Sequence, residues 1–290
     1  MVIVTGAAGR TGGEVVRLLS SRGIRVRAMV RDPKRVEGLK GPGVEVVVAD
    51  LARPITLDPA FRGADKLFLV SSPDPDVETL HGNAIEAAKR TGIRHVVRIS
   101  AIGASQACPA MLLRVHGEVD EKLSRSGLSY TILRPHFFFQ NTLMYAPTIS
   151  GDGAIYGIWK DGAIGAIDLR DVAIAAATVL TGNGHSGRVY DLTGPESLTH
   201  ERFAEILSAS LDRPVRYEDV PREAVREGLR GILPDWLAEG YLDMAALFAT
   251  GKLSELSDAY ERVTGKKARP YEQFTRDFAG AFGGAAKVEA

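Results

Sequence analysis

Three glycines near the N-terminus constrain the fold of this chain more than any other feature. In IVTGAAGRTGGEVVRLL, residues 3–19, Gly6, Gly9 and Gly12 lie three residues apart, between an apolar run and an amphipathic one. The first permits a sharp turn after a strand, the second lets the backbone approach a pyrophosphate, and the third lets the next helix pack closely on the sheet, its N-terminus aimed at the phosphates. The spacing is GxxGxxG instead of GxGxxG, which an ordinary strand-to-helix turn would also allow. Because the triplet lies in the first strand-helix unit, we expect dinucleotide binding.

The rest of the first half alternates short β-branched runs with longer stretches of helical period. Six strand-like runs separated by helices predict an α/β fold, a Rossmann-type doubly wound parallel sheet covered on both faces. The expected strands are VIVT (2–5), VRAMV (26–30), VEVVVA (44–49), KLFLV (66–70), HVVRIS (95–100) and YTILR (130–134). The expected helices between them are 12–21, 33–40, 55–62, 77–91 and 110–126.

The pattern changes after residue 134, where aromatic residues and glycines become frequent. We expect a Rossmann domain over 1–150, rejoined by 165–192, and a smaller, mainly helical C-terminal lobe over 193–290 to which 151–164 contributes. Helix start signals in the lobe are Thr199, Pro221 and Pro234. The tail GGAAKVEA, 283–290, is expected to be disordered.

Composition excludes several classes of function. Lys+Arg and Asp+Glu both number 36, so nothing indicates a nucleic acid or an anionic membrane as partner. The single Cys108 cannot form an internal disulfide, and no basic and apolar leader is recognisable, which is typical of a cytoplasmic protein. The apolar run 172–180 is about half the ~20 residues of a membrane span, so a buried helix is expected there. The six histidines are scattered, which predicts no metal site, and no Gly-x-Ser-x-Gly indicates a serine hydrolase.

The end of the second expected strand bears on cofactor choice. An acidic residue there binds the ribose 2′-hydroxyl of NAD, whereas an arginine accepts the 2′-phosphate of NADP. The sequence VRDPKR places Arg31 at the strand end, with Lys34 and Arg35 nearby. A guanidinium suits phosphate, so NADP(H) is favoured over NAD(H). A solvated basic turn is the alternative, and Asp32 keeps NAD open.

Two further strand ends are candidates for the same cofactor. Asp50 and Leu51 follow the third expected strand and are predicted to contact the adenine. Ser71 and Ser72 follow the fourth and are predicted to line the ribose side.

Several segments together resemble the NmrA-like atypical short-chain dehydrogenase/reductases, over nearly the whole chain. They are GAAGRTGG, VRDPKR, LVSSP, HGEVDEKLSRSGLSYTILRP, AIDLRDVA and YDLTGPESLTHERFAEILS. The resemblance implies a Rossmann domain with a small C-terminal lobe. The family includes NADPH-dependent quinone, azo-dye and triphenylmethane reductases, isoflavone reductases, and members that bind NADP(H) without established catalysis.

The resemblance also implies roles for individual residues. It places Arg31 on the 2′-phosphate. It places His116 where typical members carry the tyrosine of Tyr-x-x-x-Lys and Asp120 where they carry the lysine. In typical members the lysine lowers the pKa of the tyrosine, which a His-x-x-x-Asp pair cannot reproduce. By the same resemblance the phosphate loop consists of Gly6, Gly9, Arg10, Thr11 and Gly12.

The histidine and the aspartate can still act together. Residues four apart on a helix share a face, so Asp120 could hold the ring of His116 in one tautomer and favour its protonated form. His116 would then donate a proton or a hydrogen bond to the substrate. The alternative is that His116 lies at the margin of an apolar stripe. Ser100, at the end of the fifth expected strand, is a further catalytic candidate.

The only literal Tyr-x-x-x-Lys is formed by Tyr156 and Lys160. It lies in a glycine-rich stretch that resembles a hairpin or loop. In an extended strand the two residues would lie roughly 13 Å apart, at about 3.3 Å per residue. We interpret this pair as a chance match.

The segment after the sixth expected strand is the candidate substrate site. Ligands bind at the C-terminal edge of open α/β sheets. We expect His136, Phe137, Phe138 and Asn141 to contact a flat substrate, although a run of aromatic residues also packs in cores.

Two functions remain after these steps. One is an NADPH-dependent reductase that transfers hydride to a flat conjugated small molecule such as a quinone. The other is an NADP(H)-sensing regulator that engages a partner protein. An open pocket lined by 137–141 would favour the enzyme, and a filled one the sensor. The sequence leaves the substrate and the oligomeric state open, a homodimer included.

Overall fold

The computed structural model describes residues 1–283, except for the side chains of residues 35–37. The side chain of Arg35 and residues 284–290 of the predicted disordered tail therefore lie outside the described residues. The main sheet is seven-stranded and entirely parallel, with the order β3-β2-β1-β4-β5-β6-β8. The predicted Rossmann-type fold is confirmed. Its strands are β1 (Val2–Val4), β2 (Val26–Val30), β3 (Val44–Val48), β4 (Lys66–Leu69), β5 (His95–Ile99), β6 (Tyr130–Pro135) and β8 (Arg188–Leu192).

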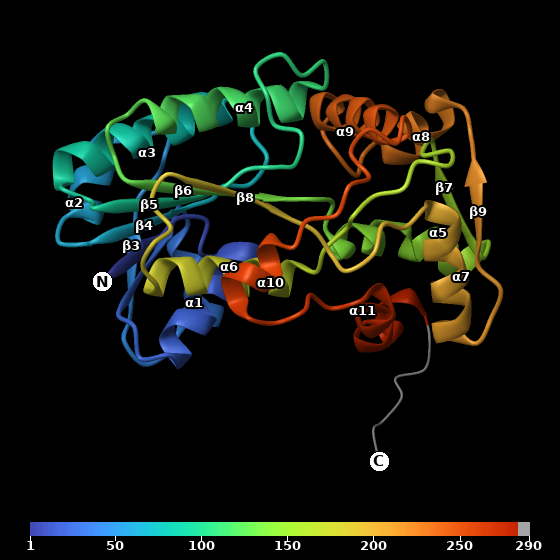
Figure 1. Ribbon diagram of the computed structural model, residues 1–290, viewed down its shortest axis with the longest axis horizontal. Coiled ribbons are helices and arrows are strands. Elements are labelled where there is room, and N and C mark those ends of the chain that lie inside the picture. Colours follow the sequence, from blue (N-terminus) through green and yellow to red (C-terminus); the bar gives the residue numbers. More distant parts are fainter. Residues whose placement is uncertain (284–290) are drawn as a thin grey trace.

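Helices cover both faces of this sheet, as Figure 1 shows. The helices α2, α3 and α4 lie on one face, and α1 and α6 lie on the other. Each layer buries its own aliphatic cluster, which explains why the strands are apolar runs rather than alternating ones. These helices are α1 (Arg10–Ser21), α2 (Leu57–Phe61), α3 (Val77–Thr91), α4 (Met111–Ser124) and α6 (Leu169–Thr181), with 3-10 turns at η1 (Pro33–Leu39) and η2 (Pro54–Thr56).

Strand order reverses between β1 and β4, and Thr5 ties the two strand ends together. Its Oγ1 donates to the carbonyl oxygen of Val70 at 2.7 Å and accepts from the Val70 N–H at 2.9 Å. Ligands of open α/β sheets bind at such a switch point, beyond the carboxyl ends of the strands. The cofactor site is therefore expected at this edge.

The lobe lies beyond the β6 and β8 ends, at the right of Figure 1. Thr199 caps α7 by accepting from the Arg202 N–H at 3.2 Å, and α8 and α9 begin directly after Pro221 and Pro234, so the three predicted helix starts are confirmed. The elements in this region are η3 (Phe139–Tyr145), α5 (Ala146–Gly151), β7 (Ala154–Gly157), α7 (His200–Leu211), β9 (Arg216–Asp219), α8 (Arg222–Leu229), α9 (Asp235–Phe248), α11 (Tyr271–Asp277) and η4 (Ala279–Phe282). Of these, η3 and nearly all of α5 lie within the stretch 1–150 that was predicted for the Rossmann domain.

One C-terminal helix returns to the sheet. Helix α10 (Ala259–Thr264) packs against α6 and β8, and its Ala259 and Tyr260 belong to the core beneath the sheet. This segment lies within the stretch assigned to the lobe above. The division into domains stays a prediction.

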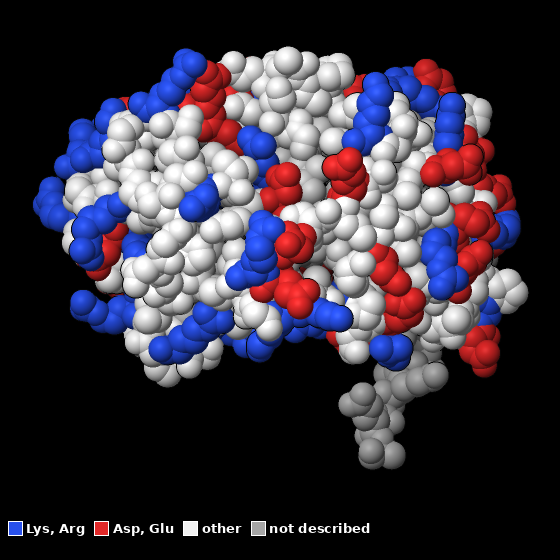
Figure 2. All heavy atoms as spheres, in the orientation of Figure 1, with Lys and Arg blue, Asp and Glu red and all other residues white. Residues whose placement is uncertain are grey.

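In Figure 2, Lys and Arg predominate on the left side and Asp and Glu are more frequent toward the centre and right, and the two balance to zero formal charge. Among the described residues, every helix is too short or too polar to cross a bilayer.

Candidate functional site

The turn between β1 and α1 has the geometry that the glycine spacing predicts. Gly6 has a φ of +57°, a conformation that side chains rarely adopt. A Cβ on Gly12 would lie 2.3 Å from the Gly6 carbonyl oxygen, so only glycine allows the helix to start against this turn. The N-cap of α1 is Gly9, which has no side chain to occupy the first-turn N–H groups. Arg10 is exposed there and Thr11 is buried. The loop is therefore a fitting cradle for a dinucleotide phosphate.

The end of β2 carries an exposed cation. Arg31 is exposed, directly after the strand. The neighbouring Asp32 caps η1, because its Oδ1 accepts from the Lys34 N–H at 2.9 Å. That bond gives Asp32 a role in the turn, and among the described side chains none forms a hydrogen bond or ion pair with the Arg31 guanidinium.

The other predicted cofactor residues occupy the neighbouring strand ends. Asp50 is half-buried, and its Oδ1 accepts from the Ala52 N–H at 3.0 Å. Leu51 is buried. Ser71 is half-buried after β4 and Ser72 is exposed. Asp50 and Leu51 follow the carboxyl end of β3 and the two serines that of β4, on either side of the β2-β1 pair, and their contacts to a cofactor stay predictions.

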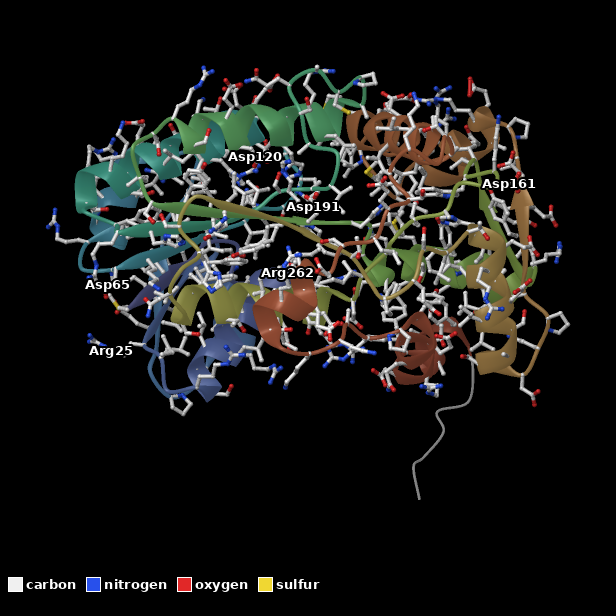
Figure 3. All side chains as sticks on the ribbon, in the orientation of Figure 1. Arg25, Asp65, Asp120, Asp161, Asp191 and Arg262 are labelled. Atoms are coloured by element: carbon white, nitrogen blue, oxygen red, sulfur yellow. The ribbon has the colours of Figure 1, made fainter. Side chains whose placement is uncertain are left out.

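A buried polar cluster lies between α3, α4 and the sheet, and Arg98 is its centre. Arg98 is on β5 and its side chain is 0% exposed. It forms an ion pair with Asp120 and donates from Nη2 to Nδ1 of His116 at 3.0 Å. Its Nε donates to Nδ1 of His81 at 3.3 Å. Ser100 donates to Oδ2 of Asp120 at 2.8 Å. Figure 3 shows Asp120 between α4 and the sheet.

The predicted pairing of His116 with Asp120 is wrong. The carboxylate is bound by Arg98, by Ser100 and by Arg134, whose Nη2 lies 2.9 Å from Oδ2, and the nitrogen of His116 that faces the cluster meets Arg98. Two guanidinium groups carry full charge, so they compete better for a buried carboxylate than an imidazole does.

The protonation state expected of His116 is also wrong. Burial, together with the Arg98 charge, lowers the pKa of His116 to about 3, so the ring is neutral at pH 7. Because a guanidinium only donates, Nδ1 accepts and Nε2 carries the proton. His116, which is half-buried, can still donate a hydrogen bond to a substrate. The hydroxyl of Ser100 donates its proton to Asp120, and the catalytic role of Ser100 stays a prediction.

The predicted substrate residues divide into two kinds. His136 and Phe137 are buried. Nε2 of His136 lies 3.0 Å from the Leu253 carbonyl oxygen, and the ring of Phe137 packs edge-on against Trp159 at 5.4 Å. Phe138 and Asn141 are half-buried. His136 and Phe137 therefore pack against the lobe. Of the four residues, only Phe138 and Asn141 have accessible surface that could contact an acceptor.

The literal Tyr-x-x-x-Lys does not resemble an active site. Tyr156 lies on β7, where its hydroxyl is 3.4 Å from Oδ2 of Asp152. Lys160 is exposed, in the turn beyond the strand. This pair is in the lobe, away from the ends of β1 and β4.

Sequence reasoning missed Arg98 and His81. A signal for Arg98 exists: it is the one charged residue inside the otherwise apolar run HVVRI, which both helix layers cover. A charge there needs a buried partner. Within the described residues, no group of His, Cys, Asp and Glu could hold a metal ion.

Comparison with known proteins places this site in context. Residues 6–181 match the family described as NAD(P)H-binding. The chain is 37% identical to the NAD(P)H azoreductase of Xenophilus azovorans, over 98% of this chain and 100% of that protein. The NADPH-dependent quinone oxidoreductase of Escherichia coli, solved with NADPH, has a TM-score of 0.88 at 29% identity and covers 96% of this chain and 100% of its own. NmrA, a negative transcriptional regulator solved with NADP, has a TM-score of 0.78 at 21% identity over 95% and 94% of the two chains, a likeness of fold alone.

Proposed function

Because this chain belongs to the NAD(P)H-binding family, we propose that it is an oxidoreductase that uses NADPH to reduce a flat conjugated small molecule, such as a quinone or an azo dye. The observation that carries this choice is the neutral His116. With a pKa of about 3, His116 is almost entirely unprotonated at pH 7 and has no imidazolium proton to transfer. A flat conjugated acceptor delocalises the negative charge that it gains with the hydride, and a quinone also becomes aromatic, so such an acceptor needs little acid assistance.

Different residues would bind the cofactor and the acceptor. The α1 N-terminus and the Gly6 turn would hold the pyrophosphate, and Arg31 the 2′-phosphate, which favours NADP(H) over NAD(H). When bound, NADPH supplies a hydride, which is two electrons and one proton. The Nε2–H of His116 would donate a hydrogen bond to the acceptor atom that gains charge. The second proton comes from water. Phe138 would stack on the acceptor and Asn141 would hydrogen-bond its rim.

A non-catalytic sensor of NADP(H) has one observation in its favour. His136 and Phe137 fill the space where an open pocket would distinguish an enzyme. Against it stand the reductase relatives, one of them similar along the whole chain. The half-buried Phe138 and Asn141 also leave an acceptor some surface.

Anaerobic NADPH oxidation by the purified protein tests the proposal, with a quinone, an azo dye and an α,β-unsaturated ketone offered separately. Affinities for NADPH and NADH are measured by calorimetry on the same sample. We expect turnover of the first two acceptors well above the uncatalysed rate. Tight NADPH binding without turnover of any acceptor would support the sensor instead.

A further inference from the structure

We propose that Arg98 is a positioning residue that fixes the ring protons of both His81 and His116 on Nε2, and thereby the direction of two hydrogen bonds at the sheet edge. One of these bonds reaches the predicted ribose side and the other the predicted acceptor. This role rests on the proposed function only in that His116 meets an acceptor.

The contacts of Arg98 use three different nitrogens. Nε donates to Nδ1 of His81 at 3.3 Å, and Nη2 donates to Nδ1 of His116 at 3.0 Å. Nη1 donates to the Asp120 carboxylate and, at 3.4 Å, to the backbone oxygen of His116. Burial lowers the pKa of Arg98 to about 10, so it stays charged at pH 7. A charged guanidinium has no acceptor atom, which leaves each imidazole a single neutral tautomer.

The tautomer of His81 determines the direction of a hydrogen bond at the predicted cofactor site. Because Nδ1 accepts, the proton of His81 is on Nε2, which lies 3.0 Å from Oγ of Ser71. Ser71 therefore accepts from the ring, and its own hydroxyl proton is free to donate. A hydroxyl with a free proton suits the oxygens of a ribose.

Stability alone does not explain an arginine at this position. Asp120 also binds Arg134 and Ser100, so it keeps a charged partner without Arg98. Replacing both partners of a buried ion pair by apolar groups of similar volume is often neutral or stabilising, whereas removing one partner is destabilising unless another charge, here Arg134, stays with the carboxylate. What an apolar residue or a lysine cannot supply is a planar fork that reaches two imidazole rings and a carboxylate at once.

Charged groups around His116 predict what happens when Arg98 is removed. On its own helix it has Asp120, on α3 it faces His81, and on β5 and β6 stand Arg98 and Arg134. Helix α9 meets α4 where Gly240 approaches Leu112, and the α9 carboxylates Glu239 and Asp243 are bound by Arg222. Removing Arg98 takes away the positive charge that helps to lower the pKa of His116, while the Asp120 carboxylate on the same helix remains, so the pKa of His116 should rise.

Nitrogen NMR of the full-length protein labelled with ¹⁵N-histidine tests this assignment without requiring activity. Asparagine variants of His81 and His116 assign the signals. In the wild type we expect both rings as neutral Nε2–H tautomers from pH 5 to 8. In Arg98→Met we expect His116 to titrate at least one pH unit higher and His81 to lose its single tautomer. Arg94→Met, which removes an exposed arginine of the same segment, should change neither ring.

Arg98→Lys is the second variant, because it keeps the charge and removes the fork. In this variant His81 should populate both neutral tautomers instead of one. The variant therefore tests the proposal even if Arg98→Met does not fold. Rings that stay Nε2–H and untitrated in the folded Arg98 variants would overturn the positioning role, as would a wild-type His116 that titrates near 6.5.

Kinetics separate this role from the proposed function. In Arg98→Lys we expect kcat to fall about tenfold while the KM for NADPH changes less than threefold, and Arg94→Met to match the wild type. A wild type without turnover would remove the reductase and leave the NMR result to decide the tautomers. Turnover with unchanged tautomers in Arg98→Lys would remove the positioning role and leave the reductase.

Discussion

The two halves of the carboxyl edge of the sheet are built in opposite ways. At the cofactor half, around the ends of β1 and β2, the exposed Gly9, Arg10 and Arg31 surround a backbone turn. At the acceptor half, beyond β5 and β6, Ser100 and His136 are buried and already hydrogen-bonded. In the first half, the backbone turn sets the geometry and the side chains are exposed to a ligand. In the second half, buried side chains hold one another in place by hydrogen bonds.

The largest expected effect is a loss of NADPH affinity when the glycine turn of the cofactor half is disrupted. In Gly12→Ala the new Cβ would lie 2.3 Å from the Gly6 carbonyl oxygen, so the turn or the helix must move. Losing one charge-assisted hydrogen bond to phosphate costs about 1.5–3 kcal/mol, and displacing the turn affects several. We expect at least a ~100-fold loss of NADPH affinity by calorimetry.

The matched control is Gly228→Ala, in α8, where a Cβ would meet no atom within 4 Å. It should bind NADPH like the wild type. Equal NADPH binding by both variants would contradict a turn shaped by glycine.

The second expected effect is a loss of stability of the acceptor half at low pH. Burial lowers the pKa of His136 to about 4 and that of His200 to about 3. Unfolding restores ordinary values near 6.5, so the unfolded state binds more protons between these limits. Stability is therefore full above about pH 6.5 and falls as the pH drops toward 4. Each group contributes a slope of up to ~1.4 kcal/mol per pH unit in that window.

His200→Phe isolates one of these groups. The ring of His200 stacks on Trp159 at 4.1 Å, and its Nδ1 is buried without a partner among the described residues. Phenylalanine keeps the stack and removes the titration. Urea unfolding between pH 4 and 7 should give a slope shallower by about 1.4 kcal/mol per pH unit or less. His185→Asn, at a half-buried site on the opposite edge, should lose little of the slope. An unchanged slope in His200→Phe would mean that the ring has the same pKa in the folded lobe as in the unfolded chain, which would contradict its burial as a neutral group.

The third effect concerns specificity within the cofactor half. Arg31→Ala removes the exposed cation at the β2 end, which is proposed to meet the 2′-phosphate. We expect NADPH affinity to fall ~10–100-fold, as for the loss of a charge-assisted bond, and NADH affinity to change little. Arg22→Ala, an exposed arginine at the far end of α1, is the control. An unchanged ratio of the NADPH and NADH affinities in Arg31→Ala would refute the assignment.

The sequence predicted the glycine turn and the strand-helix alternation of the cofactor half because this information is local, whereas the contacts of its residues to a cofactor stay predictions. Gly6 and Gly12 act through steric limits on their own turn, and the strand-helix alternation repeats along the chain. The expected parallel sheet is confirmed, and the chain belongs to the NAD(P)H-binding family, while the likeness to NmrA is one of fold alone. The strand at Arg188–Leu192 was expected only as part of an α/β stretch, because three of its five residues are exposed and it lacks a continuous apolar run.

The acceptor half was predicted poorly because its contacts come from distant segments. The four-residue spacing brings His116 and Asp120 to one helix face, but it cannot include a guanidinium from β5 that takes both partners. Likewise, the aromatic run after β6 gives no sign of which rings a later segment will cover. The carbonyl of Leu253, more than a hundred residues further on, meets His136.

The smallest expected effect lies where the two halves meet. His116→Ala removes the hydrogen-bond donor proposed for the acceptor and leaves the glycine turn intact. We expect kcat to fall about tenfold, the worth of a hydrogen bond of ~1.4 kcal/mol, with NADPH affinity unchanged. Because the pKa of His116 is about 3, it is neutral throughout pH 5 to 8, so its removal should lower kcat by the same factor at every pH in that range. His185→Ala is the matched control. A loss of rate confined to low pH would instead mean that His116 acts as a charged acid, and a wild-type rate in His116→Ala would make the ring purely structural and leave the acceptor half without a donor.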